Sequence, residues 1–207
     1  GPLPQFSAGH VTFGSFNNPG KISGQAAELW ARILHAVPAS RLVLKYRGLD
    51  DAGTSAALRD RFTGFGIKPK RLDLLGGSSY AEVLATYHRI DLALDTCPYS
   101  GTMTTLEALS MGVPVLTCPG ERMVSRTSAA HMAAAGLGDL VAASAGGLVG
   151  LAVTLAGDPA RLAELRAGMR TRLASSRLGD VSGFVSELEA LYREAWRRWC
   201  AGDGAGV

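Results

Sequence analysis

The sequence predicts an α/β protein, a Rossmann-like doubly wound parallel sheet followed by C-terminal helices. Short apolar runs alternate with amphipathic stretches from residue 11 to about residue 145, the pattern of parallel strands joined by crossover helices. Beyond residue 145 only helical periodicity continues. The 207 residues are 47% hydrophobic and 19% charged, which is typical of a globular chain able to bury one core.

The expected strands and helices alternate along the chain. Strands are expected at residues 11–16, 41–46, 71–75, 90–95, 113–117 and 139–142. Helices are expected at residues 23–36, in a stretch ending near 65, and at 79–88, 104–111 and 125–135. Ser23 is expected to cap the first of these helices and Gly112 to end the fourth, because serine accepts from helix-start N–H groups and glycine reaches left-handed backbone.

The last helix is expected at residues 182–199 and carries an apolar stripe at helical spacing. The stripe consists of Val185, Leu188, Leu191, Tyr192, Ala195, Trp196 and Trp199. As a rule such stripes pack into a core, and core packing is the prediction from periodicity alone. We expect the chain to divide into a lead-in segment (1–9), a Rossmann-like ligand-binding domain (10–180), a C-terminal helix (181–199) and a flexible tail (200–207).

Composition narrows the class of protein. The net charge of +3 is small and scattered, which argues against a nucleic-acid surface. Cys97, Cys118 and Cys200 are odd in number and lack metal-ligand spacing, so we expect neither a disulfide framework nor a metal site, and a reducing cytoplasm. No apolar run approaches the roughly 20 residues of a membrane helix. The Gly1-Pro2 start resembles a protease-cleavage scar, which indicates a piece of a longer protein.

Ligands of doubly wound sheets bind beyond the carboxyl ends of the strands, which directs attention to the loops at residues 16–23, 76–80 and 95–104. The first, FNNPGK, offers backbone N–H groups and Lys21 to an anion, or is a simple turn with a surface lysine. It matches neither G-x-G-x-x-G nor G-x-x-x-x-G-K-[ST], which argues against NAD-dependent oxidoreductases and P-loop NTPases. The second, GGSSY, is a Gly-rich turn before a Ser-capped helix.

The third loop carries the most chemistry. Gly101 allows a ligand near the backbone, and Thr102, Thr104 and Thr105 place hydroxyls and N–H groups at a helix start, where a diphosphate would be stabilised. Glu107 has two interpretations that periodicity does not separate. It completes a capping box with Thr104, or it accepts hydrogen bonds from a vicinal diol such as a ribose. Asp95 is expected to form a turn rather than to contact substrate.

Three segments carry a family resemblance: VTFGSFNNPGKIS, LWARILHAVPASRLVLK and CPYSGTMTTLEALSMGVPVLTCPGE followed by SR. Together they resemble the C-terminal half of O-GlcNAc transferase-like glycosyltransferases of the GT-B fold, a group that includes SPINDLY-type and bacterial tetratricopeptide-linked homologues. The resemblance extends from about residue 11 to residue 199. It implies that this half binds a nucleotide sugar, usually UDP-GlcNAc, without a metal or other cofactor.

The resemblance also implies roles for individual residues. Lys21 would contact the diphosphate, with Asn18 beside it where animal enzymes have Gln. Glu107 would hold the ribose where those enzymes have Asp. The remaining donor contacts would come from Ser78 and Tyr80, near the base, and from Gly101, Thr102, Met103 and Thr104, near the phosphates. Relatives have a Lys in place of Tyr80, and commonly Gly-His-Thr-Thr where this chain has GTMTT, which leaves open weaker binding, a different donor or compensation elsewhere.

The family's acceptor-side half, its proposed catalytic histidine and its tetratricopeptide superhelix precede this segment, so His10 is not that histidine. Protein acceptors would bind through those parts, and the last helix normally crosses to the other half, so its stripe is partly uncovered here or meets a second copy of the chain. The implied reaction is an inverting sugar transfer to a protein Ser or Thr. Lys21 stabilises the leaving group, and these residues offer no general base. The alternatives are a nucleotide-sugar binding module, a GT-B transferase using GDP-fucose or UDP-glucose, and a hexosamine epimerase.

Overall fold

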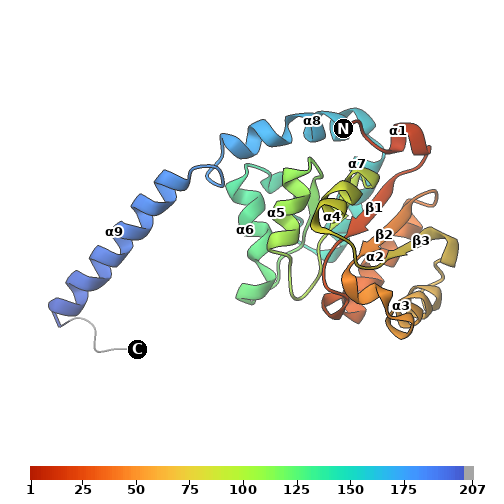
Figure 1. The fold of residues 1–207 in the computed structure, drawn as a ribbon, viewed down its shortest axis with the longest axis horizontal. Helices are drawn as coiled ribbons and strands as arrows, with labels where there is room; N and C mark the ends of the chain where they lie inside the picture. Colours follow the sequence, from red (N-terminus) through yellow and green to blue (C-terminus); the bar gives the residue numbers. More distant parts are fainter. Residues whose placement is uncertain (203–207) are drawn as a thin grey trace.

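A five-stranded parallel sheet, surrounded by helices, forms the body of the protein (Figure 1). The structure is a computed structural model and describes residues 1–202. The strands are β1 (Thr12–Ser15), β2 (Arg41–Lys45), β3 (Leu72–Leu75), β4 (Leu92–Leu94) and β5 (Val115–Leu116). Their spatial order is β3-β2-β1-β4-β5. The chain therefore builds outward from β1 in one direction, then returns to its other side, and the topological switch point lies between β1 and β4.

The helices connect and cover these strands. The α-helices are α1 (Gln5–Ala8), α2 (Gly24–Ala36), α3 (Ala52–Gly64), α4 (Tyr80–Thr86), α5 (Met103–Ser110), α6 (Thr127–Ala134), α7 (Ala145–Ala156), α8 (Pro159–Ala174) and α9 (Val181–Cys200). Short 3-10 helices are η1 (Pro19–Lys21), η2 (Arg47–Asp50), η3 (Pro69–Arg71), η4 (Tyr87–Arg89), η5 (Met123–Ser125) and η6 (Gly138–Leu140).

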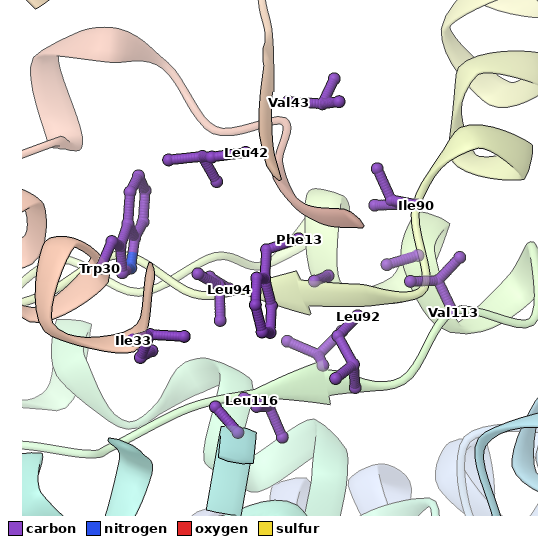
Figure 2. Packing of buried hydrophobic residues seen from close by; sticks show 14 of the residues in the cluster. Phe13, Trp30, Ile33, Leu42, Val43, Ile90, Leu92, Leu94, Val113 and Leu116 are labelled. Atoms are coloured by element: carbon purple, nitrogen blue, oxygen red, sulfur yellow. The ribbon is translucent and has the colours of Figure 1, made fainter. Parts of the chain in front are cut away.

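The core lies where the central strands meet α2. All residues of β1 and β4 are buried, as expected for strands covered on both faces. Figure 2 shows Phe13 of β1 close to Leu92 and Leu94 of β4, with Trp30 of α2 nearby. The indole N–H of Trp30 donates to the Asp95 carbonyl at 3.3 Å. The core thus fixes the end of β4, from which the third candidate loop leaves.

Several local predictions are confirmed. Ser23 caps α2, its hydroxyl accepting from the Ala26 N–H at 3.0 Å. Gly112 follows α5 with φ of 79°, the left-handed backbone that favours glycine. Ser79 caps α4, and Glu82 bonds back to the Ser79 N–H to complete a capping box.

The expected sixth strand is wrong. Residues 138–140 form η6, and only one bridge, between Thr117 and Val141, continues the sheet. Because β5 is itself two residues long, it presents almost no edge for a further strand to pair with.

The prediction that the stripe of the last helix packs into a core is also wrong. None of the residues of α9 is buried, and Trp196 and Trp199 are each 67% exposed. Figure 1 shows the reason: α9, in blue, projects away from the sheet, so no element within residues 1–202 covers it. Of the expected flexible tail at 200–207, residues 203–207 lie outside the described residues.

Candidate functional site

A cleft of about 350 Å³ lies at the carboxyl edge of the sheet, beside the switch point. The residues that line it follow β1, β2 and β3 or belong to α4 and α5. They are Phe16, Lys45, Tyr46, Arg47, Gly76, Gly77, Ser78, Tyr80, Val83, Thr104 and Glu107. Four of the nine predicted donor-binding residues, Ser78, Tyr80, Thr104 and Glu107, therefore meet in one cleft although they lie far apart in the sequence.

The wall formed by Gly76 and Gly77 is held from two sides. The ammonium of buried Lys45 donates to the Gly76 carbonyl, and the Gly77 N–H donates to Asp50 Oδ2 at 2.7 Å. A Cβ atom at Gly76 would lie 1.7 Å from Asp50 Oδ1. A side chain at this position would therefore have to displace the Asp50 carboxylate, which holds the Gly77 N–H.

Glu107 is not part of a capping box, so that interpretation is wrong. Helix α5 begins at Met103, and Thr102, its N-cap, makes no side-chain capping bond. The Thr104 hydroxyl instead donates to Asn17 Oδ1 at 3.0 Å. The Glu107 carboxylate, one turn into the helix, is half-buried and available to the cleft.

Two tyrosines lie beside this carboxylate. The Tyr87 hydroxyl lies 3.2 Å from the Thr104 carbonyl and 3.5 Å from Glu107 Oε2, and its one proton can be donated to either acceptor. Burial, and then the Glu107 carboxylate, raise the pKa of the Tyr87 phenol. Interaction with the Glu107 carboxylate raises the pKa of the exposed Tyr80 phenol. Both phenols therefore remain protonated and able to donate at neutral pH.

The start of α5 has the character of an anion site. The N–H groups of Met103, Thr104 and Thr105 have no acceptor among the described residues, and the first donor that is bonded is that of Leu106, to the Thr102 carbonyl. Free N–H groups and the positive end of the helix dipole stabilise negative charge. Thr102 and Met103 are themselves exposed.

Lys21 joins the first loop to the third. Its Nζ donates to the Ser100 carbonyl at 3.1 Å and lies 3.9 Å from the centre of the Tyr99 ring. Desolvation lowers the pKa of the ammonium, and the Asp95 carboxylate opposes this shift. Asn18, by contrast, is exposed, and its side chain caps η1 by accepting from the Gly20 N–H.

Asp95 has the turn-forming role expected from the sequence. Its buried carboxylate accepts from the N–H groups of Thr96 and Gly101, at 2.9 and 2.7 Å, and from the Thr117 hydroxyl at 2.7 Å. Burial raises the pKa of the carboxyl group, and these hydrogen bonds oppose the shift. A Cβ atom at Gly101 would lie 2.7 Å from the Thr104 and Thr105 hydroxyls, so packing within the loop itself requires this glycine.

Similarity to known proteins identifies the family of this chain. The chain matches Glycosyl transferase family 41 over residues 4–188. It belongs to this family. The probable SPINDLY UDP-N-acetylglucosamine–peptide N-acetylglucosaminyltransferases of Solanum lycopersicum and Oryza sativa are 39% and 40% identical to it, over 98% and 100% of the chain. The family 41 chain spans 22% of the length of each.

A solved structure of an O-GlcNAc transferase mutant from Thermobaculum terrenum superposes on the family 41 chain with a TM-score of 0.89 and 41% identity. The match covers 95% of this chain and 38% of that one. The C-terminal domain of a Francisella tularensis group 1 glycosyl transferase, at 13% identity and a TM-score of 0.59, shares the fold. The predicted fold class, the C-terminal half of a GT-B glycosyltransferase, and the resemblance to the SPINDLY and O-GlcNAc transferase group are thereby confirmed.

Sequence reasoning missed several residues of the family 41 cleft. Lys45 is the last residue of β2, and Tyr46 and Arg47 follow it directly. A lysine at the end of a buried apolar strand was an available signal. Phe16 ends the first apolar run of the sequence, and no neighbouring residue indicated that its side chain would line the cleft.

Two wider properties concern the part of the family 41 chain that the structure describes. Among residues 1–202, no cluster of three or more His, Cys, Asp or Glu side chains has a metal-binding arrangement. No helix in the same range is long and apolar enough to cross a membrane.

His10 lies away from the cleft, on a cavity of about 690 Å³ that also includes Thr12 and Arg41 at the starts of β1 and β2.

Proposed function

We propose that this chain is the donor-binding half of an inverting glycosyltransferase that moves GlcNAc from UDP-GlcNAc to a Ser or Thr hydroxyl of a protein, without a metal. One observation carries the proposal. The cleft containing Glu107, the unpaired N–H groups of α5 and the Lys21 ammonium are grouped at the carboxyl edge of a doubly wound sheet, where this fold binds nucleotides. Family membership and the relatives' names support the choice of donor and acceptor.

The donor would follow the cleft from base to phosphates. The base would lie toward Ser78 and Tyr80, and the ribose diol would donate to Glu107, because a carboxylate accepts two parallel hydrogen bonds well. The diphosphate would reach the start of α5, near Gly101, Thr102, Met103 and Thr104. Lys21, with Asn18 on the same loop, would approach it from the first strand.

The contribution of this half to the reaction is electrostatic. When the acceptor oxygen attacks the anomeric carbon, the bond to the donor phosphate breaks and its electron pair remains on the leaving diphosphate. Lys21 and the α5 N–H groups, already in place, stabilise this developing charge. The acceptor proton would leave to a base outside this chain, since Glu107 is committed to the ribose.

We also propose a cellular compartment and binding partners for this chain. A reducing cytoplasm suits three free cysteines. The protein acceptor would bind through regions outside this chain. The exposed apolar stripe of α9 would allow self-association of the isolated chain.

Calorimetric titration of the chain with UDP, UDP-GlcNAc, GDP-fucose and NAD tests the proposal. We expect UDP and UDP-GlcNAc to bind and NAD not to bind. Preference for GDP-fucose would change the donor within the same class of enzyme, and no response to any nucleotide would refute the proposal. The isolated chain should transfer almost no sugar to a protein, which separates a donor-binding half from a complete transferase.

A further inference from the structure

Tyr87 lies beside Glu107, the carboxylate proposed to hold the ribose. Its side chain is almost fully buried, at 1% exposure, and its hydroxyl is 3.2 Å from the Thr104 carbonyl and 3.5 Å from Glu107 Oε2. A buried phenol that meets both the first turn of α5 and its carboxylate is placed to determine where that carboxylate points. This argument rests on the proposed ribose contact of Glu107.

The Tyr87 hydroxyl is held rigidly. Its ring packs on Phe16 at a centroid distance of 4.0 Å and an interplanar angle of 32°. Phe16 directly follows β1 and is itself buried. Because the ring contacts the core, we expect the hydroxyl to keep its position relative to α5 when a nucleotide binds.

A second tyrosine, Tyr80, reaches the cleft from α4. It is the first residue of α4, which is fixed by the capping box of Ser79 and Glu82, and it lines the cleft together with Glu107. The segment 80–87 therefore brings one phenol to 3.5 Å from the Glu107 carboxylate and places a second phenol in the same cleft. A carboxylate offers about four lone-pair directions, so the phenols can occupy some of them and leave the rest to a diol.

We infer that Tyr87, assisted by Tyr80, is a positioning residue that orients the Glu107 carboxylate for the ribose hydroxyls of the donor. The phenols hold the side chain in its binding conformation before the nucleotide arrives. Less conformational freedom is then lost on binding, which strengthens the ribose contact in particular.

The experiment measures discrimination between UDP and 2′-deoxy-UDP by calorimetry, for the parent chain, Tyr87→Phe, Tyr80→Phe and Glu107→Ala. We expect the parent to bind UDP about tenfold more tightly than the deoxynucleotide, as for a hydrogen bond to a charged group. Glu107→Ala should reduce the ratio to about one. Tyr87→Phe should reduce it to about threefold, and Tyr80→Phe should also reduce it, because each removes a donor but keeps the ring.

Tyr46→Phe is the matched control, since Tyr46 lines the same cleft but its hydroxyl has no partner among the described residues. Any change in its affinity should apply equally to both nucleotides. A melting curve for each variant separates loss of fold from loss of discrimination, and Tyr80→Phe, at an exposed position, tests the inference even if Tyr87→Phe unfolds.

The outcomes separate this inference from the proposed function. Parent-like discrimination in both folded tyrosine variants, or in Tyr80→Phe alone if Tyr87→Phe unfolds, would overturn the inference and leave nucleotide binding intact. A parent chain that binds UDP and the deoxynucleotide equally would overturn it too, because Glu107 would then not hold the ribose. If GDP binds better than UDP, the same ratio is measured with GDP and 2′-deoxy-GDP. Absence of any nucleotide binding would overturn both.

Discussion

Lys21 combines a partly desolvated position with a proposed role that requires its charge. Its pKa is lowered from the ordinary value, chiefly by desolvation, and only the ammonium form attracts a diphosphate. UDP affinity should therefore fall as pH rises through this lowered pKa, at a lower pH than for a fully solvated lysine.

Titrations with UDP from pH 7 to pH 10 check this prediction. Lys21→Arg should remove the dependence, because a guanidinium remains charged throughout this range. An affinity that is constant for the parent chain, or that falls equally in the arginine variant, would show that Lys21 does not contact the diphosphate.

Gly76 marks the point where the cleft wall has no space for a side chain. A Cβ atom would lie 1.7 Å from Asp50 Oδ1, so Gly76→Ala should displace the loop, lower the free energy of unfolding by about 1–3 kcal/mol and weaken nucleotide binding. Denaturant unfolding with calorimetry measures both effects.

Gly150→Ala provides the comparison. Gly150 lies in α7 with no atom within 4 Å of a Cβ, so this variant should be more stable by about 0.5–1 kcal/mol and bind normally. Equal behaviour of the two alanine variants would contradict the close approach of Asp50.

The apolar stripe of α9 predicts that the chain associates with a second copy of itself. Trp196 and Trp199 lie on an exposed helix face, so the parent chain should form dimers at high concentration, driven by burial of this face. Trp196→Glu should abolish the dimers without lowering the melting temperature of the monomer, because the side chain does not contribute to the core. Sedimentation velocity over a range of concentrations measures the association.

Arg193→Gln is a suitable control on the charged side of α9. It breaks only the exposed pair with Glu189, which contributes little, so association should persist. A parent chain that stays monomeric at all concentrations, or dimers unaffected by Trp196→Glu, would exclude the stripe as the contact.

Local signals in the sequence predicted the elements well. The strands alternated with helices as expected, and Ser23 and Gly112 mark helix ends because capping depends on nearby atoms. Of the two interpretations of Glu107, the capping box was wrong because α5 begins at Met103 and the Thr104 hydroxyl bonds Asn17, 87 positions away. The core assignment of the α9 stripe was wrong because amphipathicity shows that a face needs a partner without showing that one is present.

For the candidate site, the sequence predicted which loops converge, because topology brings all strand ends to one edge. It did not show that Lys45 and Asp50 hold the Gly76–Gly77 wall, or that Tyr87 meets Glu107, since these contacts depend on the packing of segments distant along the chain.

In the whole molecule, the switch point between β1 and β4 explains why the candidate site lies at this part of the carboxyl edge of the sheet. The loop after β1 provides Lys21, and the loop after β4 leads to the open start of α5. Both leave adjacent strands at the same edge, so a cation and free N–H groups face the same region. The buried Asp95 network keeps the loop after β4 in place without using the α5 donors.

The most direct test of the central claim is a calorimetric titration of UDP into the parent chain, Lys21→Ala and Glu107→Ala. The account predicts a saturable response in the parent that is weakened at least about tenfold by each substitution, since each removes a charged hydrogen-bonding partner. No UDP response in the parent, or a response that neither substitution changes, would contradict it.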